Sequence, residues 1–218
     1  MRNLLWGILL VGIIGIGGFV YRNAAEHPSQ PIACPVDALV CPDGTAVSRT
    51  GNSCTFPVCP PPNVSLSDIS ISFAIPTGFV TAPVPDATSI VAYTLSETPT
   101  TASSTDVADI VIRRYAVDAS STPLRTIQQT AISSASGLPI GATSFTSTVL
   151  NNHRFTVVTV DRFEGVIDTA YYLARGTDVL RFDAIDKNVA NWTDANLDMS
   201  TLPAHKALEK LLTTLQGQ

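Results

Sequence analysis

The sequence predicts an α+β fold in which two helices cover an antiparallel sheet, preceded by an N-terminal transmembrane helix and a small disulfide-stapled island. Three observations support this fold. Residues 4–21 are apolar, and four cysteines lie within residues 34–59. In residues 64–218, several segments alternate apolar and polar residues as strands do, and two others repeat apolar residues at helical spacing. The expected parts are a transmembrane anchor (1–22), a linker (23–33), a cysteine-rich island (34–59), a proline spacer (60–63) and an α+β domain (64–218).

The apolar stretch over residues 4–21 contains no charge and no proline, and an arginine flanks it on each side. At about 1.5 Å per residue, its 18 residues form a helix roughly 27 Å long, the short end of what spans a bilayer. A cleaved signal peptide has a shorter apolar core, and Asn23 stands where its cleavage site needs a small residue. We therefore expect a signal anchor that crosses the cell membrane once, with the C-terminal domain extracytoplasmic. The alternatives are a cleaved signal peptide and a lipoprotein modified at Cys34, although Cys34 lies far beyond the apolar core.

Composition limits the choice of partners. The chain of 218 residues has a net charge of −5, and 18 acidic residues face 13 basic ones. Two of the basic residues flank residues 4–21, so the part beyond the anchor is more acidic still. An acidic surface repels phosphate backbones, which makes nucleic acid an unsuitable partner. The expected partners are the membrane, through residues 4–21, and a protein or another envelope component.

The cysteines Cys34, Cys41, Cys54 and Cys59 predict two disulfides. An island of this size buries too little apolar surface to fold unaided, and each disulfide stabilises by about 2–4 kcal/mol. Zinc is the alternative, but the cysteines form no C-x-x-C pair and no histidine lies between them. Three pairings are possible, and we favour Cys34–Cys54 with Cys41–Cys59.

The run CPDGTAVSRTGNSCTFPVCP over residues 41–60 contains two turn sequences, which predict a small hairpin of Thr45–Arg49 with Cys54–Phe56. The run resembles a short cysteine-rich motif of uncharacterised exported bacterial proteins. It is loosely similar to the start of Kazal-type inhibitor modules, although those have six cysteines and this island has four. The resemblance implies export rather than a particular activity.

The domain over 64–218 opens with Asp68–Ile75, whose strict alternation predicts a half-buried strand that ends at Pro76-Thr77-Gly78. Asn151-Asn152 and Arg175-Gly176-Thr177 are typical hairpin turns. The other expected strands are Ser89–Leu95, Asp109–Val117, Phe145–Leu150, Arg154–Asp161, Val166–Ala174 and Asp178–Ile185. Arg113 and Arg114 are adjacent in one of them, so they point to opposite faces of the sheet.

Two helices complete the domain. The first is capped by Ser121 or Thr122, has Pro123 in its first turn and is expected to reach Gly137. The second begins near Thr201, with Lys206, Glu209 and Lys210 off its apolar stripe. The stripe consists of Ala204, Leu208, Leu211, Leu212 and Leu215.

The turn Ile75-Pro76-Thr77-Gly78-Phe79, and the hairpin of Ala170-Tyr171-Tyr172-Leu173 with Arg175-Gly176, resemble the corresponding parts of PsbP-like domains. The chain departs from that pattern by ending on a helix without a closing strand. The resemblance implies an accessory or scaffolding module.

We expect no catalytic, metal-binding or cofactor-binding residues and no cofactor, because metalloprotease, nucleophile-elbow, P-loop and dinucleotide motifs are all absent. The three histidines, His27, His153 and His205, lie in separate elements. Four aspartates on neighbouring strands are candidate cation ligands, but we interpret them as an exposed acidic face: Asp161, Asp168, Asp183 and Asp186.

The expected function is that of a membrane-anchored, non-catalytic extracytoplasmic binding or scaffolding module of a bacterial envelope. One alternative is a protease-inhibitor-like protein that presents Val47–Asn52 from the disulfide island. The other is an enzyme with an unrecognised site, which requires a pocket of converging titratable groups.

Overall fold

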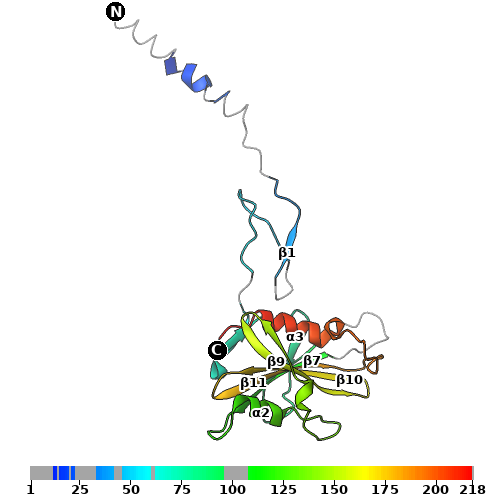
Figure 1. Cartoon of the computed structure of the whole chain (residues 1–218). Helices are drawn as coiled ribbons and strands as arrows, with labels where there is room; N and C mark the ends of the chain where they lie inside the picture. Colours follow the sequence, from blue (N-terminus) through cyan, green and yellow to red (C-terminus); the bar gives the residue numbers. More distant parts are fainter. Residues whose placement is uncertain are drawn as a thin grey trace, which may run out of the picture. The chain divides into compact units, whose positions relative to one another are not determined.

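The computed structural model describes residues 12, 13, 15–19, 21, 22, 33–41, 46–59, 62–95 and 108–217 (Figure 1). The chain divides into two compact units, which are described separately. The first unit contains residues 1–37 and 48–57, and the second contains residues 38–47 and 58–218.

The expected transmembrane anchor is wrong. Residues 12, 13, 15–19, 21 and 22 are helical and exposed, but among the described residues no helix is long and apolar enough to cross a membrane. Gly12, Gly15, Gly17 and Gly18 belong to this helical stretch, and glycine adds no apolar side chain and weakens a helix. The predictions of a signal anchor and of a single-pass membrane localisation depended on this helix and are therefore wrong as well. The remainder of residues 4–21 lies outside the described residues.

The first unit is organised around Arg49 and a disulfide between Cys34 and Cys54. The Arg49 guanidinium donates to the Asp37 carboxylate at 2.8 Å and to the Cys54 carbonyl at 3.0 Å. It also lies 4.2 Å from the centre of the Phe56 ring, a cation–π geometry. One arginine thereby connects three separate points of a unit that has little apolar core.

The second unit contains the other disulfide, between Cys41 and Cys59. Both bonds follow the pairing favoured from the sequence, and disulfides are typical of oxidising compartments. The expected hairpin is present at its turn, where Thr50 forms an antiparallel bridge with Thr55. Its first strand, β2 (Ala46–Ser48), pairs instead with β1 (Ala38–Val40).

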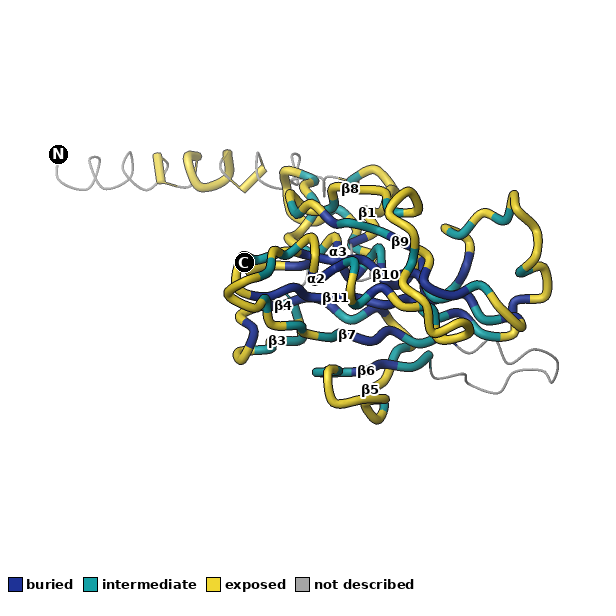
Figure 2. The backbone as a smooth tube through the Cα atoms, turned by 60° about the horizontal axis from the view of Figure 1, so that its bottom comes forward, coloured by how far each residue is buried: buried dark blue, intermediate teal, exposed yellow. Residues whose placement is uncertain are grey.

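A seven-stranded sheet forms the body of the second unit, and all neighbouring strands in it are antiparallel. In spatial order the strands are β5 (Phe79–Ala82), β6 (Ser89–Leu95), β7 (Ala108–Ala116), β11 (Asp178–Asp186), β10 (Val166–Ala174), β9 (His153–Phe163) and β8 (Thr146–Leu150). The central strands are the most deeply buried (Figure 2). Six of these strands were expected from the sequence, and only β5 was missed.

A second, two-stranded sheet pairs β3 (Val64–Leu66) with β4 (Ile71–Phe73). The single strand expected over Asp68–Ile75 is therefore interrupted. Ser67–Ile69 forms a 3-10 turn, and Ser70 ends it in the left-handed region at φ 52°. Ile69, Ile71 and Phe73 nevertheless all pack into the core, on either side of the break. This shared burial explains why the sequence alternates apolar and polar residues there although the strand is interrupted.

The fold class also needs correction, since the chain is mostly sheet rather than α+β. The α-helices of the domain, α2 (Pro123–Thr130) and α3 (Pro203–Thr213), have only 8 and 11 residues. They lie on opposite faces of the sheet (Figure 1). The helix α2 stops well before Gly137 because Ile132 bridges Pro139, and the chain between them turns back on itself.

The main core lies between α3 and the sheet. Leu208, Leu211 and Leu212 of α3 are completely buried against residues of β7, β11 and neighbouring strands. The predicted apolar stripe of the last helix is thus confirmed. A smaller core on the other face packs Ile127 and Ala131 against β9, β10 and β11.

We expect Leu211→Ala to lower the free energy of unfolding by about 2–5 kcal/mol, because it leaves a cavity where a fully buried side chain stood. Urea unfolding measures the loss. The matched control is Leu124→Ala on α2, where the leucine is 59% exposed and the expected loss is within about 0.5 kcal/mol. Equal effects at the two positions would contradict the core assignment.

We expect the native chain to show no free thiol, because the described structure pairs all four cysteines. Alkylation in denaturant without reductant, followed by intact-mass measurement, should add no label. The reduced sample serves as the control and should take up a label at every cysteine. Labelling before reduction would disprove the two disulfides.

Candidate functional site

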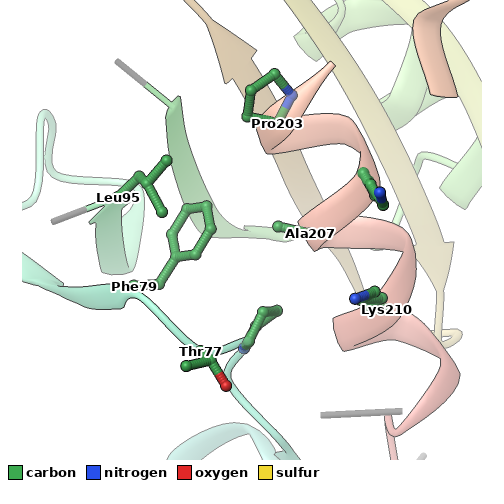
Figure 3. A pocket seen from close by; sticks show the side chains of 8 residues that line it. Thr77, Phe79, Leu95, Pro203, Ala207 and Lys210 are labelled. Atoms are coloured by element: carbon green, nitrogen blue, oxygen red, sulfur yellow. The ribbon is translucent and has the colours of Figure 1, made fainter. Parts of the chain in front are cut away.

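A hollow of about 250 Å³ lies between α3 and the start of β5 (Figure 3). We call it the α3–β5 hollow. It is lined by Pro76, Thr77, Phe79, Leu95, Pro203, Lys206, Ala207 and Lys210. In Figure 3, Pro203, Ala207 and Lys210 lie on the helix side, while Phe79 and Leu95 of the sheet and Thr77 of the turn before β5 lie opposite them.

The sheet side of the hollow depends on a tight turn. The Phe79 amide donates to the Pro76 carbonyl at 3.3 Å, which closes a four-residue turn. Gly78 adopts φ +93° within it, and a Cβ there would lie 3.2 Å from the Leu95 side chain. Only glycine adopts this conformation without strain, so the Pro-Thr-Gly sequence fixes the place of Phe79 beside Leu95.

The helix side follows from helical periodicity. Pro203, Lys206, Ala207 and Lys210 recur at spacings of three and four residues, so they share one face of α3. The start of the helix is held by Asp186, whose carboxylate accepts a hydrogen bond from the Ala204 amide at 2.7 Å. That bond satisfies one of the free amides of the first turn and fixes where the helix begins.

Two ammonium groups belong to an otherwise apolar hollow. Within the described part of the chain, neither Lys206 nor Lys210 has an ion-pair partner, whereas Lys187 pairs with Asp109 at 2.7 Å. The two lysines are one helical turn apart, about 6 Å along the axis. Among the described residues, the lining contains no carboxylate, histidine or cysteine, so these residues offer an apolar surface and positive charge but no acid–base pair.

His205 belongs to a different cluster on α3. Its Nε2 lies 3.0 Å from the Tyr171 hydroxyl, which also donates to Glu209 at 3.3 Å. Burial lowers the pKa of His205 and raises that of Tyr171, so both side chains favour their neutral forms. None of the three lines the hollow, and the cluster joins α3 to β10.

The four aspartates proposed as an exposed acidic face are largely buried instead. Asp161 accepts hydrogen bonds from the hydroxyls of Ser133 and Ser134, and Asp186 caps α3. Asp183 is fully buried between Arg113 and Arg181. Across the described ranges, no group of three histidines, cysteines or carboxylates is placed to hold a metal ion.

Arg113 and Arg114 point to opposite faces of the sheet, as their adjacency predicts. The Arg113 side chain is 12% exposed and contacts Asp183 near the core. The Arg114 side chain is about half exposed and pairs with Asp178 at 2.7 Å. Both arginines are occupied by structural ion pairs.

Asp168 is the least well satisfied of these carboxyl groups. Its Oδ2 lies 3.4 Å from Arg181, and its buried Oδ1 has no hydrogen-bond partner within the described structure. Asp161 is its cross-strand neighbour on β9. Burial raises the pKa of Asp168 to about 6, against the opposing attraction of Arg181 and Arg113.

The residues of the hollow were not identified as a site from the sequence. Lys206 and Lys210 were placed off the apolar stripe, and Phe79 was noted only as part of a turn. The sequence did contain one signal: of its three lysines, two lie one helical turn apart in the last helix. Nothing local indicates that Phe79 lies opposite them, because strand β5 and helix α3 are far apart in sequence.

No protein-family model and no curated protein matches the chain. Among solved structures, it is similar to cyanobacterial PsbP from Synechocystis sp. PCC 6803, with 11% identity and a TM-score of 0.42 over 71% of this chain and 91% of that one. It is also similar to a protein from Bacteroides thetaiotaomicron VPI-5482, with 11% identity and a TM-score of 0.40 over 68% of this chain.

The match covers 45% of the Bacteroides protein, so the chain spans less than half of its length. The PsbP-like resemblance noted in the sequence thus recurs as a weak structural similarity. No family model supports the four-cysteine motif as a family.

We expect Asp168→Asn to stabilise the protein at pH 7.5. The native pKa of about 6 exceeds the ordinary value of 3.8, so the native state binds more protons between these values and stability falls as pH rises through them. Because a tenfold change in acidity corresponds to about 1.4 kcal/mol, the gain reaches at most about 3 kcal/mol above pH 6 and disappears below pH 4.

Urea unfolding of both proteins at several pH values measures this difference. Asp183→Asn is the contrasting control, because it leaves Arg113 and Arg181 without their shared buried partner and should destabilise by about 3–5 kcal/mol at pH 7.5. A loss of stability in Asp168→Asn at pH 7.5 would contradict the claim that the buried Asp168 carboxylate destabilises the native state at that pH.

Proposed function

We propose that this protein is a non-catalytic extracytoplasmic binding or scaffolding module that holds a segment of a protein partner in the α3–β5 hollow. The observation that carries this proposal is the chemistry of the lining. The described lining is an apolar surface with two lysines that no described residue pairs with. It offers contacts and charge to a ligand, but these residues include no nucleophile with an adjacent base.

The size of the hollow favours a peptide segment over a free small molecule. Pockets for drug-sized ligands usually measure about 300–1,000 Å³, and this hollow has about 250 Å³. Such a volume accommodates an apolar side chain and its immediate neighbours. A protein partner can anchor one side chain there and place the rest of its contacts on the surrounding surface.

The two disulfides support an extracytoplasmic location, because disulfides persist in oxidising compartments. The inhibitor alternative requires the segment around Arg49 to reach a protease. Arg49 instead uses its guanidinium on Asp37, Cys54 and Phe56 of its own unit, which disfavours that alternative.

The test is selection of peptides from a displayed random library on the full oxidised chain, followed by affinity measurement of the selected peptides. We expect Ala207→Leu, which fills the hollow, to weaken binding by about tenfold or more. Ala142→Leu is the matched control, because Ala142 is exposed and does not line the hollow.

Selected peptides that bind wild type and Ala207→Leu equally would place the binding elsewhere. Failure to enrich any peptide would argue against a peptide-binding module. Circular dichroism and unfolding of each variant separate lost binding from lost folding.

A further inference from the structure

Resting on the function proposed above, we infer that the α3–β5 hollow selects an acidic peptide segment: one apolar side chain inserts between Phe79 and Ala207, and nearby carboxylates pair with Lys206 and Lys210. The charge, the spacing and the shape of this one surface determine the chemistry of the partner.

Charge complementarity is the first support. Lysines are scarce in this acidic chain, and two of the three border the same hollow. Lys187 is neutralised by Asp109, whereas no described residue pairs with Lys206 or Lys210. The two ammonium groups repel each other across one helical turn, and bound carboxylates relieve that repulsion. An anionic partner is therefore favoured over a neutral or cationic one.

The spacing of the two lysines selects among acidic partners. They are about 6 Å apart along the helix axis, and side chains two positions apart on an extended strand are about 6.6–6.8 Å apart. An extended peptide with acidic residues at alternate positions therefore presents both carboxylates at matching distance. The apolar side chain must lie close to this pair, because the lysines and the apolar lining share one hollow.

The shape of the lining supports an aliphatic or aromatic anchor. Phe79 and Leu95 form one wall, and Ala207 leaves space on the helix where a larger residue would fill the hollow (Figure 3). Lys210 lies on the helix side of the hollow in the same view. The anchor thus contributes burial, while the carboxylates contribute specificity and orientation.

Extended phosphate surfaces fit this surface less well. A nucleic acid or an anionic bilayer presents many charges over a wide area, and the net charge of −5 disfavours such an extended anionic surface. A short peptide needs complementarity only over the few ångströms around the hollow. At ordinary salt, screening limits the range over which the acidic residues of the protein repel an anionic peptide to about 8–10 Å.

The test compares two synthetic probes on the full oxidised chain, Gly-Ser-Leu-Ser-Asp-Ser-Asp-Gly and its counterpart with asparagine in place of both aspartates. Fluorescence anisotropy of labelled probes at low salt should show the acidic probe binding about five- to twenty-fold more tightly, because each exposed pair contributes a few-fold. Screening at about 0.5 M salt should largely remove the preference.

Lys206→Gln with Lys210→Gln should abolish the preference for the acidic probe. The matched control, Arg125→Gln with Arg154→Gln, removes the same total charge from exposed positions that do not line the hollow and should preserve the preference. Lys206→Glu with Lys210→Glu should reverse it, favouring a probe with lysines at the two positions. A reversed preference cannot result from unfolding.

Equal binding of the aspartate and asparagine probes, with both still weakened by Ala207→Leu, would overturn the acidic specificity and leave the binding module standing. Failure of both probes to bind at about 1 mM, a very weak limit, would overturn the hollow as a docking site together with the acidic specificity. Loss of preference in the arginine control would show that net charge, rather than the two lysines, selects the ligand.

Discussion

The burial of the α3 leucines against the sheet fixes the geometry on which the candidate site depends. Leu208, Leu211 and Leu212 are fully buried, so the helix has one rotation about its axis that removes all of them from water. Residues three and four apart share a face, so this rotation also directs Lys206 and Lys210 toward β5 and β6. The cationic rim of the hollow is thus a consequence of core packing.

A second constraint acts on the opposite face of the same sheet. The central strand β11 alternates Leu180, Phe182 and Ala184 on the α3 side with Arg181 and Asp183 on the α2 side. A slip of one residue would move both charged side chains under α3 and remove the apolar set from the main core. Burying these arginine and aspartate side chains costs desolvation free energy. Their contacts also disfavour any other register of β11, so Leu180, Phe182 and Ala184 remain beneath α3.

The parts of the fold that local sequence determines were predictable, and the parts that depend on strand order were not. The hairpins at Asn151-Asn152 and Gly176 follow from turn chemistry, and these residues adopt the positive φ angles that such turns require. The burial of Asp183 depends on β11 being central, which alternation alone does not reveal. The spacing of apolar residues likewise did not predict the break at Ser70 or the early end of α2. The hollow joins elements more than 100 residues apart.

The edge position of the hollow explains why a side-chain anchor is the favoured mode of docking there. The strand β5 ends the sheet next to the hollow, and an exposed edge commonly recruits a partner strand through its backbone. Here β5 has only four residues, and Pro76 and Pro83 flank it. Proline donates no amide hydrogen and leaves an added strand little ladder to join. A partner that approaches this edge therefore gains most by inserting a side chain between β5 and α3, where the two lysines determine which charges it carries.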